Sequence, residues 1–179
     1  GGGHWEYKKK SLPERWTVNY RELTFNIKPM GFKHTGLFPE QAVNWDLMTN
    51  LIKNAGREIN VLNLFAYTGG ATVACCKAGA HVCHVDAATA MVDRAKRNMA
   101  LSGLKDADVR YIVDDCVKFC EREIRRGHFY DAVILDPPSF GRGPKGEKWK
   151  IEDSVYDLVA LISRLLVEKP LFVLLNSYT

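Results

Sequence analysis

Small and acidic residues recur directly after short apolar runs along this sequence. The runs 61–65, 81–85, 109–113 and 132–135 are each followed by such residues, which are Thr68, Gly69, Gly70, Asp86, Asp115, Asp136, Pro137 and Pro138. Glycines let backbone amides approach a ligand closely, and carboxylates accept hydrogen bonds from sugar hydroxyls and from amino groups. This combination is typical of a site for a nucleoside cofactor.

Each group has a chemical interpretation and a structural alternative. Gly69 and Gly70 open a helix whose N-terminal N–H groups favour a carboxylate, although a bare strand-to-helix turn also explains them. Asp86 is placed to accept hydrogen bonds from ribose hydroxyls, and its alternative is a helix N-cap. Asp115 is placed to accept a hydrogen bond from an adenine amino group. Because these residues all follow predicted strands, we favour a shared role in cofactor binding over a separate structural role for each.

The sharpest motif is Asp136-Pro137-Pro138-Ser139-Phe140. The two prolines fix the backbone and remove two N–H donors, which leaves a rim of acceptors. Asp136 and the Pro137 carbonyl can then orient an amino group of a base. Phe140 can stack on that base, a contact that contributes about 1–3 kcal/mol per base. The alternative is a proline-rich loop after a strand.

The segments that must position these residues alternate between two periods. The apolar runs named above and 171–175 are predicted strands, and helices are predicted over 71–78, 89–101, 117–124 and 155–166. Strands that are apolar on both faces indicate a parallel sheet covered by helices on both faces. We therefore expect a Rossmann-like, doubly wound α/β fold with its ligand at the carboxyl edge of the sheet.

The N-terminal part has a different pattern. Weak alternation over 16–27 predicts a β-hairpin packed near the pocket, and Pro39 begins a helix with Trp45, Met48 and Ile52 on one face. We expect an extension over 1–38 and the Rossmann-like domain over 39–179. The dinucleotide motif G-x-G-x-x-G does not follow the run 61–65, which favours a smaller cofactor than NAD.

Composition sets the broad class. The chain has 179 residues, of which 46% are hydrophobic and 26% charged, and these values fit one globular domain. No apolar run approaches the roughly 20 residues of a membrane span, so we expect a cytoplasmic protein without membrane contact. The net charge of +4 permits a polyanionic partner. We expect the five cysteines to be reduced and mostly buried, and no metal site, because alternation places Cys83 and His84 on opposite strand faces.

Four segments together resemble the class I S-adenosylmethionine-dependent methyltransferase domain. They are 63–70, 85–87, 114–116 and 136–140. They are most similar to bacterial methyltransferases of large-subunit ribosomal RNA, the group with the cytosine-5 enzyme and the guanine-N7 domain. The segment 35–41 resembles the part of that group that walls the cofactor pocket.

The resemblance implies S-adenosylmethionine as cofactor and S-adenosylhomocysteine as product. The residues implied to bind the cofactor are Phe38, Gln41, Asn63, Phe65, Tyr67, Thr68, Gly69, Asp86, Ala87, Asp115 and Asp136. The residues implied to act in catalysis are Asp136, Pro137, Pro138 and Phe140. Asn176 is expected to add a hydrogen bond to the acceptor.

Departures from the group narrow the expected reaction. Cytosine-5 enzymes carry a nucleophilic cysteine near the end of the fifth strand, where this sequence has Asn176-Ser177-Tyr178-Thr179, and Cys116 lies toward the adenine side. We therefore expect methylation of a purine nitrogen in RNA. The N-terminal RNA-binding domain of the cytosine-5 members and the final strand pair of the fold are absent, so we expect a truncated domain.

The evidence for an RNA partner is the basic loop after Phe140. Arg142, Lys145 and Lys148 in that loop are placed to contact phosphates, although a solvated loop fits equally well. A small-molecule or protein acceptor, and a non-catalytic RNA-binding domain, stay open as alternatives. The sequence does not predict the oligomeric state.

Overall fold

The computed structural model describes residues 5–6, 8, 12–30, 34–142 and 148–177. Its centre is a five-stranded parallel sheet with the order β5-β4-β3-β6-β9. The strands are β3 (Asn60–Leu64), β4 (His81–Asp86), β5 (Val109–Val113), β6 (Ala132–Leu135) and β9 (Phe172–Leu175). The strand order reverses beside β3, which places the switch point of the sheet between β3 and β6.

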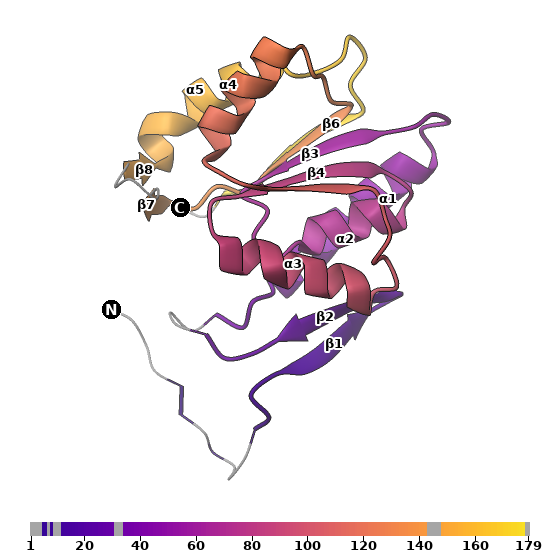
Figure 1. Cartoon of the computed structure of the whole chain (residues 1–179), viewed down its shortest axis with the longest axis vertical. Coiled ribbons are helices and arrows are strands. Elements are labelled where there is room, and N and C mark those ends of the chain that lie inside the picture. The colour runs from indigo at the N-terminus through magenta and orange to yellow at the C-terminus, as the bar shows by residue number, and fades with distance from the viewer. Residues whose placement is uncertain (1–4, 7, 9–11, 31–33, 143–147, 178–179) are drawn as a thin grey trace.

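Helices cover both faces of this sheet (Figure 1). One face carries α4 (Cys116–Arg126) and α5 (Ile151–Ser163). The other carries α1 (Ala42–Lys53), preceded by the short 3-10 helix η2 (Pro39–Gln41), together with α2 (Gly70–Lys77) and α3 (Thr89–Leu101). The side chains of β3 and β6 are almost all buried, as expected for strands covered on both sides. The predicted Rossmann-like fold is confirmed.

The N-terminal hairpin forms a further layer beyond α3 (Figure 1). Its strands are β1 (Trp16–Tyr20) and β2 (Leu23–Ile27), and they pair antiparallel. Two backbone amides of β2 bond to side chains of α3 and its C-cap, from Thr24 to the Ser102 hydroxyl at 3.0 Å and from Asn26 to the side-chain oxygen Oδ1 of Asn98 at 2.8 Å. The hairpin also packs on α1, where the ring centroids of Phe25 and Trp45 lie 5.1 Å apart, and Trp45 lines a cavity at the carboxyl edge of the sheet. These contacts agree with the predicted position of the hairpin near the pocket. The boundary at residue 38 stays a prediction.

The basic segment after Phe140 is not a loop throughout. The strands β7 (Phe140–Arg142) and β8 (Lys148–Lys150) pair antiparallel, whereas Lys145 lies outside the described residues. The expectation of a loop was therefore wrong at both ends of the segment. Within the described residues, no helix is long and apolar enough to cross a membrane.

Candidate functional site

A cavity of about 570 Å³ opens at the carboxyl edge of the sheet. The loops that follow β3, β4, β5 and β6 form most of its wall, and the segment before η2 adds His34 and Phe38. Nine predicted site residues line it, namely Phe38, Phe65, Tyr67, Asp86, Ala87, Asp115, Asp136, Pro137 and Pro138. The topology has therefore gathered side chains from segments that are far apart in sequence, as the switch-point rule requires.

A smaller cavity of about 60 Å³ shares part of this wall. Both cavities are lined by Phe38, Phe65, Tyr67 and Asp136. Three further residues that were predicted to bind the cofactor line only the smaller one, namely Gln41, Asn63 and Thr68. The predicted cofactor residues thus surround two adjoining spaces on either side of the β3–α2 loop.

Gly69 and Phe140 line neither cavity. Gly69 precedes α2 with φ +82°, and a Cβ placed there would lie 2.8 Å from the Ala95 Cβ of α3. Its glycine is required by helix packing and by the left-handed backbone. Phe140 lies in β7 and is 52% exposed. The cofactor role of Gly69 and the stacking role of Phe140 therefore stay predictions without a cavity contact.

The β3–α2 loop has an unusual backbone. Phe65 and Tyr67 both have positive φ, at +54° and +51°, although neither is glycine. Bulky residues in this region are rare and concentrate at functional sites. Thr68 fixes the loop because its hydroxyl donates to the Gly36 carbonyl at 2.7 Å and its own carbonyl accepts from the Asn98 amide at 2.8 Å. The loop is therefore held in the conformation that presents two aromatic rings to the cavity.

Asp86 at the end of β4 also shapes this loop. One carboxylate oxygen accepts from the Tyr67 N–H at 2.8 Å, and the other accepts from the Ala88 N–H at 2.9 Å. The N-cap of α3 is Ala88, so the N-cap alternative for Asp86 was wrong. Burial raises the pKa of Asp86, while the two backbone amides act in the opposite direction. Each oxygen keeps a second lone pair for a ligand hydroxyl.

Asp115 differs from Asp86 because it is an N-cap. Its side chain accepts from the Lys118 N–H at 3.0 Å and so begins α4, while it also lines the larger cavity. The neighbouring Asp114 lies outside that wall, where it forms an ion pair with Arg122. Asp115 is therefore the one of the two that lines the cavity, and its bond to the first turn of α4 fixes its position.

Asp136 lies at the end of β6, beside the switch point. The Asn176 amide donates to its carboxylate at 2.8 Å, which fixes the side chain across both cavities. Burial raises the pKa of Asp136; the Asn176 hydrogen bond lowers it and the charge of Glu40 raises it. Asn176 was predicted to contact the acceptor, and in the structure its amide positions Asp136.

Two pairs of aromatic rings line the larger cavity. Phe65 packs on Trp149 with ring centroids 5.3 Å apart, and Phe38 packs on Tyr67 at 5.5 Å. The Trp149 indole N–H also donates to the Pro138 carbonyl at 2.7 Å, which ties β8 to the proline motif. Sequence reasoning did not include Trp149 or His34 in the site. In the sequence, Trp149 is only the aromatic residue of the basic segment after Phe140. His34 only precedes the segment 35–41, which resembles the methyltransferase group.

Among the described residues, Cys116 is the only thiol in the walls of the two cavities. Cys116 lines the larger cavity but is buried, and its sulfur accepts from the Phe65 N–H at 3.3 Å. Burial raises its pKa well above the ordinary value for a thiol. Among the described residues, no three His, Cys, Asp or Glu side chains come together as a metal-binding group.

A buried histidine beneath the site predicts acid sensitivity. His84 is fully buried; its Nδ1 lies 2.9 Å from the Thr72 hydroxyl, and its Nε2 has no hydrogen-bond partner among the described residues. Burial lowers its pKa to about 4, so the unfolded chain binds the extra proton between pH 4 and the ordinary pKa of about 6.5. We expect the free energy of unfolding to fall by about 2 kcal/mol between pH 7 and pH 5.

Urea unfolding at the two pH values measures this difference, with His84→Gln as the control that removes the titrating group. The wild type should lose more stability on acidification than the variant. Equal losses in both proteins would show that His84 does not carry the effect.

The parallel sheet and the cavity at its carboxyl edge define a Rossmann-like cofactor-binding domain. The family model for S-adenosylmethionine-dependent methyltransferases matches residues 4–168. This chain belongs to that family, as the sequence motifs predict.

Several relatives are ribosomal RNA large subunit methyltransferases K/L. The chain is 31% identical to the Shewanella frigidimarina protein over 144 residues, which cover 79% of this chain and 19% of that protein. It is 37% identical to the Methylococcus capsulatus protein over 112 residues, which cover 62% of this chain and 15% of that protein. The chain thus spans less than a quarter of the length of these relatives.

Two solved structures are also similar. A S-adenosylmethionine-dependent methyltransferase from Agrobacterium tumefaciens superposes with a TM-score of 0.89 at 41% identity, covering 93% of this chain and 54% of that one. A methyltransferase in complex with S-adenosylhomocysteine superposes with a TM-score of 0.77 at 25% identity, covering 90% of this chain and 42% of that one.

Proposed function

We propose that this chain transfers a methyl group from S-adenosylmethionine to a base nitrogen in RNA, with ribosomal RNA as the favoured substrate. The observation that carries the proposal is the larger cavity, where Asp86, Asp115 and Asp136 from three different strand ends share one wall. This arrangement offers separate acceptors to a ribose, to an adenine and to a second amino group. The family membership supports the same cofactor.

The residues present fit this cofactor. Asp86 has free lone pairs for two ribose hydroxyls, and Asp115 lies in the same wall for the adenine amino group. Phe65 and Tyr67 line both cavities and provide apolar faces beside these acceptors. The remaining predicted residues, Gln41, Asn63 and Thr68, surround the smaller cavity and are proposed to hold the amino acid end of the cofactor. When bound, the cofactor supplies an electrophilic methyl group on a sulfonium.

The acceptor side is assigned to the proline motif. Asp136 is held by Asn176 and is proposed to accept a hydrogen bond from an amino group, with the Pro137 carbonyl as a second acceptor. The Pro138 carbonyl already accepts from the Trp149 indole N–H. Because methyl transfer is an in-line displacement, orienting the acceptor lone pair supplies much of the rate. Trp149 has an aromatic face in the same wall and is proposed to pack against the acceptor base, a task that the sequence assigned to Phe140.

A nitrogen acceptor fits the thiol chemistry of the site. Attack on cytosine C5 requires a thiolate at the acceptor side, whereas the pKa of Cys116 is raised and its sulfur is engaged by the Phe65 N–H. The relatives named as ribosomal RNA large subunit methyltransferases K/L support ribosomal RNA as the substrate class. A ribosomal RNA substrate also agrees with the predicted cytoplasmic location, which stays a prediction.

Transfer of a labelled methyl group to an unmodified large-subunit ribosomal RNA transcript tests the proposal. We expect label in the RNA, on a purine nitrogen after nuclease digestion. Label on a cytosine carbon would contradict the nitrogen assignment. Tight binding of S-adenosylhomocysteine without any label in RNA would favour a small-molecule or protein acceptor, and absence of both would favour a non-catalytic domain.

A further inference from the structure

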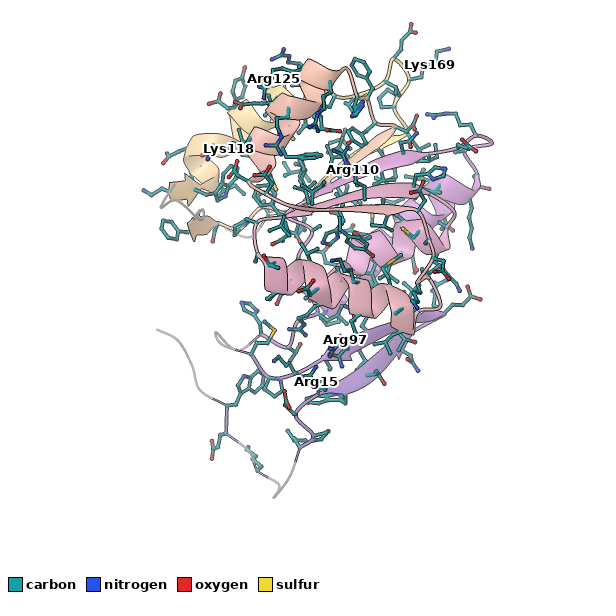
Figure 2. All side chains as sticks on the ribbon, in the orientation of Figure 1. Arg15, Arg97, Arg110, Lys118, Arg125 and Lys169 are labelled. Carbon is teal, nitrogen blue, oxygen red and sulfur yellow. The ribbon has the colours of Figure 1, made fainter. Side chains whose placement is uncertain are left out.

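A cluster of cations lies where the N-terminal hairpin meets α3, away from the cofactor cavity. Arg15, Lys28, Arg94 and Arg97 line a hollow of about 120 Å³ together with Asn26 and Asp93. Figure 2 shows Arg15 and Arg97 close to each other on this side of the molecule. Arg97 and Arg94 come from α3, whereas Arg15 and Lys28 flank the hairpin, so the hollow is built from both elements.

Carboxylates neutralise this cluster only in part. Glu14 bonds Arg15 at 2.8 Å, and Asp93 lies 3.5 Å from Lys96, both in exposed pairs of little strength. Within the residues that the structure describes, no ion pair involves Lys28, Arg94 or Arg97. Burial lowers the pKa of Arg94, and the charges of Arg15 and Arg97 lower it further. Several positive charges therefore surround the hollow, and they favour the binding of an anion there.

Arg94 connects this hollow to the cofactor cavity. Its guanidinium donates to the Asn26 carbonyl of the hairpin at 3.3 Å and to the Thr35 carbonyl at 3.4 Å. Gly36 has φ +89°, a backbone conformation that favours glycine, and the same guanidinium lies beside its Cα. The segment 34–38 that Arg94 holds supplies His34 and Phe38 to the cavity wall. A ligand at the hollow therefore lies one side chain away from the wall of the proposed active site.

We propose that this hairpin–α3 hollow binds the phosphodiester backbone of the RNA substrate outside the catalytic cavity. The inference rests on the proposed RNA methyltransferase function and extends it, because it assigns a surface that none of the sequence motifs includes. Arginine and lysine side chains from two elements provide the spaced positive charges that successive phosphates require. Backbone contacts of this kind fix the position of the strand, while the cavity selects the base.

Fluorescence anisotropy of a labelled single-stranded RNA tests the proposal over a series of salt concentrations. The variant is Lys28→Gln with Arg97→Gln, since Arg94 also holds the segment 34–38 and would confound the result. The matched control is Arg125→Gln, an exposed cation on α4 at the other side of the sheet (Figure 2). Thermal unfolding of each protein verifies that it is folded.

We expect the double variant to bind RNA about tenfold more weakly at low salt, and its salt slope to fall by about 1.4 for two lost phosphate contacts. The control should match the wild type. An unchanged double variant, or an equal loss in Arg125→Gln, would overturn the hollow as the site. If the hollow bound only inorganic phosphate in calorimetry, and RNA affinity did not depend on it, the backbone assignment would also fail.

The proposed function fails in a different way. If the wild type bound no RNA at any salt concentration, both the hollow and the RNA acceptor would be contradicted. Calorimetric titration of S-adenosylhomocysteine into the same preparation would then report separately whether the cofactor site is present.

Discussion

Replacing Asp136 with asparagine is expected to lower the rate of methyl transfer to RNA by about 10²-fold or more. The asparagine oxygen still accepts from Asn176, so the local hydrogen bond of 2.8 Å in the native protein can be kept. The negative charge that orients the acceptor amino group is lost. The measurement is labelled methyl transfer under single-turnover conditions with saturating cofactor.

The matched control is Asp114→Asn. Asp114 follows β5 at the same edge of the sheet but pairs with Arg122 and does not line the cavity. The control should keep nearly the full rate. If Asp136→Asn retained the wild-type rate, Asp136 would have no part in positioning the acceptor.

Replacing Glu123 with alanine is expected to lower the free energy of unfolding by about 3–5 kcal/mol. Glu123 is fully buried on α4 and receives hydrogen bonds from Arg110, Arg126 and the Tyr130 hydroxyl, with the His128 ring 3.1 Å away. Figure 2 shows Arg110 between α4 and the sheet. Removal of the carboxylate leaves the buried Tyr130 hydroxyl without its acceptor and separates α4 from the strands.

Urea unfolding at pH 7 measures this loss, with Asp114→Ala as control. Asp114 also pairs with an arginine of α4, but both partners are partly exposed, so a loss of about 1 kcal/mol or less is expected. Similar losses in the two variants would show that burial of the Glu123 network adds no stability.

The stability that the Glu123 network contributes is expected to fall at acid pH. Burial alone would raise the pKa of Glu123, but the hydrogen bonds from Tyr130, Arg110, His128 and Arg126 outweigh it and lower the pKa to about 2. The stabilisation is therefore complete above the ordinary carboxyl pKa of about 4.3 and is lost as the pH falls toward 2. This window lies below that of His84, so the two acid transitions are separable.

The fold could be predicted well from the sequence because the spacing of apolar residues indicates which faces of strands and helices are buried. The strand at 132–135 is apolar throughout and was located with its correct bounds, as was the helix at 89–101. The strands β7 and β8 were missed because they are short and lie in a basic segment without alternation. The contacts of the hairpin with Asn98 and Ser102 were not predicted, because no local pattern indicates them.

The site was predicted less completely than the fold. Asp86 and Asp136 line the cavity as predicted, because each lies at the end of a parallel strand and all these strands end at the same edge of the sheet. Phe140 belongs to the same motif but lines neither cavity and is 52% exposed, whereas Trp149 of the paired strand β8 lines the larger cavity. The cofactor role of Gly69 stays a prediction; its φ of +82° and the Ala95 side chain of α3 beside it favour glycine at this position. The surroundings of Trp149 and Gly69 depend on packing between elements, which the sequence motifs do not indicate.

Calorimetric titration of S-adenosylhomocysteine into the wild type and into Asp86→Asn tests whether the cavity binds the cofactor through Asp86. We expect micromolar binding by the wild type and an affinity about 10- to 100-fold lower in the variant, since a charged acceptor of ribose hydroxyls is lost. Asp108→Asn, an exposed carboxylate at the opposite edge of the sheet, should bind like the wild type. No binding by a folded wild-type chain, or equal affinity in Asp86→Asn, would contradict the cofactor site described above.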